Sequence, residues 1–332
     1  MSFETVTIAG GTGKVGHFIA EAFLEDGSYR IKILRRKSNE EDSNEMARSL
    51  ASKGAEIVYV DYYKKDDLVK ALQGTDVLIS ALNMDFVGGA SYYDVQTPLL
   101  NAAKDASVKR FIPSEFGVKM KYRANPLTDN KKLFRDSVEK SGLEYTYIYF
   151  GVLQEEIFLC GFDIEKKKAT FFGDGSKKIP TTSFSDFGKY IVESLRMPEA
   201  RNSEITVAGA NMSPFEYLEI FEKVTGSKWE VVVNRKVVDV IFLDRFMAAV
   251  AQEAEFEKLD NDKFSFAPRP VSEVIEELVN QVSGETDTVS NFTLSYNISD
   301  ITPSGTTYYD KLMKFLGCYT YKDIDIAYFK TC

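Results

Sequence analysis

Three glycines, Gly10, Gly13 and Gly16, lie three residues apart near the N-terminus. Glycines allow a tight turn and a close backbone approach to a ligand, and the N–H groups that open a following helix attract negative charge. An apolar run at 6–9 precedes them and an amphipathic stretch at 18–23 follows, which predicts a strand, a loop and a helix. A glycine-rich hairpin is the alternative, but no second strand follows at hairpin spacing. We expect a cradle for the pyrophosphate of a dinucleotide, lined by Gly10, Gly11, Thr12, Gly13, Lys14, Val15 and Gly16.

The run 29–34 in the second expected strand is followed by three consecutive cations, Arg35, Arg36 and Lys37. An NAD enzyme would place a carboxylate here to bind the ribose 2′-hydroxyl. A guanidinium binds a phosphate through a planar fork, whereas a carboxylate would repel it. The run therefore favours NADP(H) over NAD(H), with Arg35 as the main contact and Arg36 or Lys37 assisting. A solvated run of charges at a strand end is the alternative.

The composition limits the class of protein and its partners. The chain has 332 residues, 44% of them hydrophobic, which is enough for a substantial core in one large domain or two joined ones. Its formal charge of -9 disfavours broad nucleic-acid binding, because a polyanion would be repelled. Since no apolar run could span a membrane, we expect a cytoplasmic protein that binds a small-molecule substrate, as a monomer or a homodimer.

Histidine and cysteine are scarce. The single histidine, His17, excludes multi-histidine metal sites, and its place beside the glycines suits packing near the cofactor better than proton transfer. The three cysteines are far apart and odd in number, which indicates neither a disulfide framework nor a zinc pair and fits a reducing compartment. No acidic cluster has the spacing of a metal site, so we expect no metal.

Strand-like and helix-like segments alternate through the first half of the chain. Strands are expected near 5–9, 30–35, 55–60, 76–81 and 109–113, and helices near 14–26, 43–53, 66–73 and 92–106. This order predicts an α/β protein with a Rossmann-type doubly wound parallel sheet, in which ligands bind outside the carboxyl ends of the strands. The residues expected there beside the glycine loop are Asp61, Leu82, Asn83, Phe116 and Phe150.

The pattern changes in the second half of the chain. A helix near 129–141 and a strand near 144–149 continue the alternation, and beyond Gly151 it becomes irregular. We expect a cofactor-binding domain over residues 1–155, to which 180–210 return, and a smaller, mostly helical substrate-binding region over 156–332. The helices expected in that region lie near 213–225, 236–259 and 308–315.

The glycine spacing resembles that of short-chain dehydrogenases, most of which carry a tyrosine four residues before a lysine. None of the eighteen tyrosines has a lysine at that position, so another acid must serve. Lys131 and Lys132 follow the loop after the fifth expected strand. A lysine amine can donate a proton to a carbonyl or enone oxygen or hold the nicotinamide ribose, and burial lowers its pKa toward neutrality. An exposed lysine on a helix is the alternative.

Several motifs together resemble the isoflavone reductase and NmrA-like branch of atypical short-chain dehydrogenases, most strongly through about residue 200. They are the glycine loop 10–16, Arg35, Lys109-Arg-Phe-Ile-Pro-Ser-Glu-Phe-Gly117, Lys131-x-x-Phe-Arg135 and Gly142-Leu-Glu-Tyr-Thr-Tyr147. The resemblance implies an NADPH-dependent reductase in which Lys131 is catalytic, with Lys132 as the competing assignment.

Apolar side chains are expected to hold the nicotinamide and the substrate away from water. Tyr149, Val152 and Leu153 are the candidates for the substrate pocket, with Phe116 and Phe150 at the nicotinamide; core packing is the alternative for each. Plant reductases carry Asn followed by aromatics in this segment, so the resemblance assigns no isoflavone or lignan substrate. We expect hydride transfer to a small hydrophobic carbonyl, enone or quinone. The second hypothesis is an NADP(H)-sensing regulatory protein without turnover.

Overall fold

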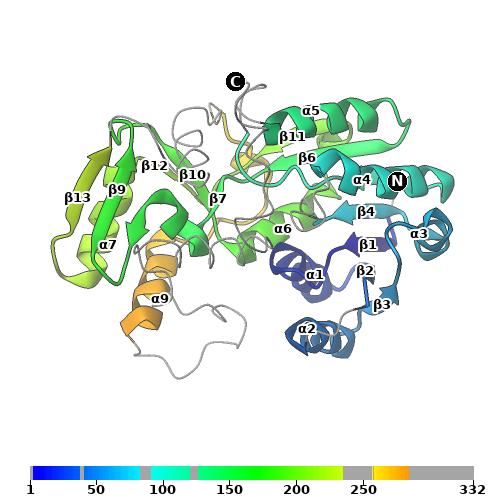
Figure 1. The fold of residues 1–332 in the computed structure, drawn as a ribbon, viewed down its shortest axis with the longest axis horizontal. Coiled ribbons are helices and arrows are strands. Elements are labelled where there is room, and N and C mark those ends of the chain that lie inside the picture. The colour runs from blue at the N-terminus through cyan, green and yellow to red at the C-terminus, as the bar shows by residue number, and fades with distance from the viewer. Residues whose placement is uncertain are drawn as a thin grey trace, which may run out of the picture.

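The structure is a computed structural model that describes residues 3–37, 41–82, 91–119, 126–234, 256 and 258–283, with the backbone alone at 41–43, 126–128, 172 and 234. Its centre is a sheet of seven parallel strands in the order β11-β6-β5-β4-β1-β2-β3 (Figure 1). The strands are β1 (Thr5–Ala9), β2 (Arg30–Arg35), β3 (Glu56–Tyr59), β4 (Val77–Ser80), β5 (Arg110–Ile112), β6 (Glu144–Tyr149) and β11 (Ser203–Thr206). The predicted Rossmann-type sheet is confirmed.

Helices cover both faces of this sheet because alternate side chains of each strand point to opposite faces. Val6 and Ile8 share a core with α1, α2 and α6, whereas Ala9 and Leu34 share one with α3, α4 and α5. The helices are α1 (Lys14–Asp26), α2 (Glu41–Ser52), α3 (Lys65–Leu72), α4 (Tyr92–Asp105), α5 (Pro126–Glu139) and α6 (Phe184–Ser194). In the described part of the chain, no helix has the length and apolar character needed to cross a membrane.

A second, smaller lobe lies beside the main sheet and contains two three-stranded sheets, β12-β10-β7 and β13-β9-β8 (Figure 1). Its elements are β7 (Val152–Leu153), η1 (Gln154–Cys160), β8 (Phe162–Asp163), β9 (Lys168–Phe172), β10 (Ile179–Thr182), β12 (Ala210–Met212), α7 (Pro214–Thr225), β13 (Glu230–Asn234) and α9 (Val271–Ser283). Two short 3-10 helices, η2 (Pro198–Ala200) and η3 (Asn261–Lys263), lie beside β11 of the main sheet. Beside its helices, the lobe carries short strands that the sequence did not predict. They are two to five residues long, too short for their periodicity to be recognised.

Two expected segments cannot be compared with the structure. The helix near 236–259 lies almost wholly outside the described residues, and the final helix near 308–315 lies entirely outside them. The helix expected near 213–225 is α7, which packs with α9 around the aromatic core of the second lobe.

The chain returns from the second lobe to the main sheet through two elements. After β10, α6 packs against α1, and β11 then adds to the edge of the sheet beside β6, with Ser203 opposite Thr146. Residues 184–206 thus complete the sheet that the first 150 residues begin.

The contact between α1 and α6 requires a glycine. A Cβ at Gly188 would lie 2.6 Å from Ala22 Cβ and 2.7 Å from the Phe18 carbonyl oxygen. Close by, the rings of Phe18 and Phe184 stack with their centroids 4.3 Å apart. The two helices are therefore as near as their backbones allow.

Replacing Gly188 by alanine should force α1 and α6 apart. We expect Gly188→Ala to lower the free energy of unfolding by about 1–3 kcal/mol, as overpacking of a core does. Urea unfolding followed by circular dichroism measures this loss. Glu25→Ala, at an exposed position on α1, is the control and should change stability by less than about 0.5 kcal/mol. Equal stability of the two variants would contradict the packing described above.

Candidate active site

The glycine loop connects β1 to α1 through backbone contacts that need glycines. Gly10 has a φ of +78°, and its carbonyl oxygen accepts a hydrogen bond from the Gly13 N–H at 2.9 Å. A Cβ at Gly16 would overlap that carbonyl oxygen and lie 2.9 Å from Gly11 Cα. Gly13 precedes α1 without a side chain to cap it, and the first turn of α1 carries no acidic residue. The positive end of this helix therefore suits an anion such as a pyrophosphate.

Arg35 lies at the end of β2, next to the glycine loop, where Leu34 accepts a hydrogen bond from the Gly10 N–H. Its side chain is held by neighbours: Nη2 donates to Asn44 Oδ1 at 3.2 Å, and the guanidinium carbon lies 5.7 Å from the centroid of the Tyr59 ring. Arg35 is 3% exposed, whereas the next two cations, Arg36 and Lys37, are exposed. The structure thus brings the first of the three predicted cations into the protein at the loop and leaves the other two at the surface.

The loops after β3 and β4 place two further predicted residues. A Cβ on Gly10 would lie 3.1 Å from Leu82 Cδ2, so Leu82 is beside the glycine loop. Asp61 organises the turn after β3, since its carboxylate accepts the Tyr63 N–H at 3.0 Å and pairs with Lys64 at 3.5 Å. Asn83, predicted beside Leu82, lies outside the described residues.

Tyr62 contacts the glycine loop and was missed by the sequence analysis. Its hydroxyl donates to the Leu34 carbonyl oxygen at 3.0 Å, the same oxygen that accepts the Gly10 N–H. Burial raises the pKa of Tyr62, so the hydroxyl stays a neutral donor. An aromatic residue directly after Asp61, at a strand end, is the only signal in the sequence that could have indicated it.

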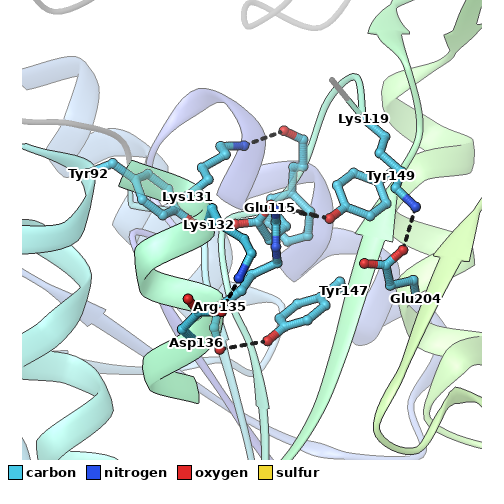
Figure 2. A network of polar contacts seen from close by, with 11 residues as sticks. Tyr92, Glu115, Lys119, Lys131, Lys132, Arg135, Asp136, Tyr147, Tyr149 and Glu204 are labelled. Carbon is cyan, nitrogen blue, oxygen red and sulfur yellow. Dashed lines mark hydrogen bonds and ion pairs between the residues drawn. The ribbon is translucent and has the colours of Figure 1, made fainter. Parts of the chain in front are cut away.

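Lys131 leaves α5 toward the carboxyl ends of the strands. Its Nζ donates to the Phe116 carbonyl oxygen at 3.3 Å and lies 5.4 Å from the centroid of the Tyr92 ring. Burial lowers the pKa of Lys131, the Glu115 carboxylate raises it, and the Arg135 guanidinium lowers it. Figure 2 shows that Lys131 and Lys132 leave the helix in different directions, with Lys132 paired to Asp136 on its own helix.

A fully buried carboxylate, Glu115, lies beside this lysine (Figure 2). Its Oε2 accepts hydrogen bonds from Arg135 Nη1 at 2.8 Å and from the Tyr149 hydroxyl at 3.4 Å, and its Oε1 accepts a long one from the Tyr92 hydroxyl at 3.5 Å. Glu115 raises the pKa of Tyr92 and Tyr149 further than burial alone does. Glu115 and Arg135 lie in the motifs that resemble the family, but the sequence predicted no role for them.

The predicted apolar residues pack into or against the hydrophobic cores. Phe116 and Phe150 both pack on Phe187 of α6, with ring centroids 4.9 and 4.1 Å away. Val152 and Leu153 of β7 are buried in different cores, Val152 in that of the second lobe and Leu153 in that of the main sheet. Tyr149, the remaining residue predicted for the substrate pocket, is buried with its hydroxyl on Glu115.

Two carboxylates of η1 that the sequence analysis missed contact the cofactor half of the molecule. Glu156 Oε1 pairs with Nζ of Lys14, the first residue of α1, at 2.6 Å. Glu155 accepts the Phe184 N–H with both of its oxygens, each at 3.1 Å, at the start of α6. Burial raises the pKa of Glu155 to about 7, although the hydrogen bond from Phe184 opposes the rise. Nothing in the local sequence distinguishes these two residues from surface acids.

Comparisons with known proteins show the family and the fold. The model of the NmrA-like family matches residues 2–293, so the likeness extends beyond residue 200. Eugenol synthase 1 of Petunia hybrida is 29% identical over 240 residues, covering 68% of this chain and 76% of its own. Pinoresinol reductase 1 of Arabidopsis thaliana is 29% identical over 243 residues, covering 68% and 75%. The complex of leucoanthocyanidin reductase with NADPH from Vitis vinifera has the same fold, with a TM-score of 0.71 and 23% identity, over 83% of this chain and 99% of that one.

The raised pKa of Glu155 should make stability depend on pH. Because the folded state holds this proton more tightly than the ordinary value of 4.5 implies, the contribution of Glu155 to stability is complete below about pH 4.5 and is lost as the pH rises through about 7. The glutamine in Glu155→Gln stays neutral at every pH. Between about pH 5 and about pH 8, we therefore expect the free energy of unfolding of this variant to rise by about 1–3 kcal/mol relative to that of the wild type. Thermal unfolding of both proteins across this range measures the gain. A difference that stays constant with pH would contradict it.

Proposed function

Because this chain belongs to the NmrA-like family, we propose that it is an NADPH-dependent reductase that transfers a hydride to a small hydrophobic carbonyl, enone or quinone. The observation that carries the proposal is the position of Lys131, whose Nζ lies between the Phe116 carbonyl oxygen and the Tyr92 ring at the carboxyl ends of the strands. In doubly wound folds this edge of the sheet is where cofactors and substrates meet. The pinoresinol reductase and the NADPH complex among the similar proteins support the reaction class and the cofactor.

The glycine loop fits a dinucleotide on the structure's own geometry. Since a Cβ at Gly16 would overlap the Gly10 carbonyl oxygen, the backbone is folded as tightly as glycine permits, and the first turn of α1 carries no acidic residue that would repel the pyrophosphate. Bound NADPH supplies the hydride. In the proposed complex the loop 10–16 holds the pyrophosphate, Arg35 binds the 2′-phosphate with help from Arg36 or Lys37, and Leu82, Phe116 and Phe150 lie on the side of the nicotinamide.

Lys131 acts as the proton donor in this proposal. An ammonium group has three N–H donors, so one can hold the Phe116 carbonyl while another reaches the substrate oxygen. Burial lowers the pKa of Lys131, which makes its proton easier to transfer to the negative charge that develops on that oxygen. Hydride added at carbon and a proton added at oxygen give an alcohol from a carbonyl and an enol from an enone.

The apolar neighbours account for the proposed substrate class. Tyr149, Val152 and Leu153 are buried where β6 passes into β7, each in a different hydrophobic core. A substrate placed beside them would contact rings and aliphatic side chains and would be shielded from water, which favours an apolar body with a single reacting oxygen.

Replacing Lys131 by alanine should remove the proton donor. We expect Lys131→Ala to lower kcat by about 10²- to 10⁴-fold, the usual contribution of a general acid, while NADPH affinity stays within a few-fold. The measurement is NADPH oxidation with a panel of quinones, enones and aromatic aldehydes, with NADPH binding followed by calorimetry. Lys132→Ala, on the neighbouring lysine paired to Asp136, is the control and should keep its turnover.

Two other outcomes would contradict parts of this proposal. Loss of turnover in Lys132→Ala with retention in Lys131→Ala would reverse the assignment of the two lysines. Tight NADPH binding by the wild type with no turnover across the panel would favour the second hypothesis, a protein that senses NADP(H).

The preference for NADPH should depend on Arg35. We expect Arg35→Gln to weaken NADPH binding about tenfold and to leave NADH binding nearly unchanged, because only NADPH carries the 2′-phosphate. Dissociation constants for both cofactors test this, with thermal unfolding as a check because Arg35 also holds Asn44. Arg30→Gln, at the opposite end of β2, is the control. Equal losses for the two cofactors would remove Arg35 from the phosphate site.

A further inference from the structure

We propose that Glu115 is a positioning residue for Lys131, holding the lysine side chain directed at the edge of the sheet where the substrate oxygen would lie. This inference rests on the proposed role of Lys131 in the reductase. It adds a second residue to the proposed site, the completely buried carboxylate of Glu115.

The first support is the number of groups that hold the Glu115 carboxylate in place. Arg135, Tyr149 and Tyr92 all donate to it, from α5, β6 and α4 respectively. The Arg135 Nη1 also donates to the Tyr149 hydroxyl at 3.3 Å, so two of the donors are bonded to each other. A carboxylate bound from three elements has a single orientation.

The second support is the way in which the same groups reach Lys131 (Figure 2). Arg135 follows Lys131 by four residues on α5, which places both on one face of the helix. The Tyr92 side chain contacts both Glu115 and Lys131: its hydroxyl donates to Glu115, and its ring faces the Lys131 ammonium. Phe116, whose carbonyl oxygen accepts the hydrogen bond from Lys131 Nζ, is the residue next to Glu115 in the chain. A shift of Glu115 would therefore move both contacts of the lysine.

The third support is electrostatic. Burial lowers the pKa of Lys131 and so favours the uncharged amine, and Arg135 acts in the same direction, whereas the Glu115 carboxylate opposes both. Among the described residues, the groups that act on Lys131 are Arg135 from α5, Tyr92 from α4, and Glu115 and the Phe116 carbonyl from the loop after β5.

Stability alone gives little reason for a buried ion pair between Glu115 and Arg135. Replacing a buried ion pair by apolar residues of similar volume is often neutral or stabilising, because desolvating two charges costs about as much as their attraction returns. The Glu115 carboxylate of this pair also accepts hydrogen bonds from the hydroxyls of Tyr92 and Tyr149. A function in setting the charge of Lys131 explains why charged groups occupy this site.

The test is the ionisation of Lys131 measured directly, by NMR titration of its side-chain Cε and Hε resonances in ¹³C-lysine-labelled protein. The resonance of Lys131 is identified by its loss in Lys131→Arg. We expect the titration midpoint to fall by about one pH unit in Glu115→Gln, because the opposing carboxylate is gone and Arg135 remains. It should rise in Arg135→Gln, in which Glu115 remains. Asp136→Asn removes a carboxylate of the same helix that pairs with Lys132, and its midpoint should equal that of the wild type.

An unchanged midpoint in Glu115→Gln, or an equal shift in Asp136→Asn, would overturn the inference. If Glu115→Gln does not fold, the upward shift in Arg135→Gln decides, and its absence overturns the inference as well. Turnover is measured beside the titration, so that the role of Glu115 and the proposed reductase activity are tested separately. If the wild type turns over, the alkaline limb of its kcat profile should follow the titration midpoint of Lys131. A midpoint that moves in a protein without turnover leaves Glu115 as the positioning residue and removes the reductase, whereas turnover with an unmoved midpoint does the reverse.

Discussion

The approach of the Gly16 backbone to the Gly10 carbonyl is the constraint on which the arrangement of both lobes depends. It directs α1 back across the sheet directly from the end of β1, with the positive end of the helix at the carboxyl edge of the sheet. The same helix then supplies the surface on which α6 packs, through the backbone-to-side-chain contact at Gly188. Because α6 follows directly from the second lobe, the contact at Gly188 and the Lys14–Glu156 ion pair both join that lobe to α1.

The residues proposed for chemistry come from segments that are distant in sequence and meet for a topological reason. Glu115 and Phe116 follow β5, Tyr149 ends β6, and Lys131 and Arg135 lie on the helix that connects these two strands. In a parallel sheet the loops at the carboxyl ends of adjacent strands are neighbours, so a strand, its following loop and the next helix bring their side chains to one place. The combination of a cation, a carboxylate and tyrosine hydroxyls in this apolar setting is possible because each polar atom has a partner there.

Local sequence patterns were sufficient for the main sheet and insufficient for the second lobe. The strands at 30–35 and 144–149 and the helix from Tyr92 have strong periodicity or a clear capping residue, and they lie where they were expected. The strands of the second lobe, such as β7 with Val152 and Leu153, are defined by partners far away in the chain, which a single sequence does not reveal. The same limit applies to the site. Lys131 belongs to a recognisable motif, whereas the burial of Glu115 and the contact of Arg35 with Tyr59 arise only when α4, α5 and β3 pack.

The late return of α6 and β11 to the main sheet has a consequence for synthesis of the chain. When the first 150 residues have left the ribosome, β6 is still an open edge and the apolar side of α1 that will face α6 has no cover. Both are completed only when residues 184–206 emerge, after β7 to β10 of the second lobe have been made. The two lobes therefore mature together rather than in sequence, and a nascent chain of this protein presents an uncovered strand edge and helix face for the time needed to translate about fifty residues.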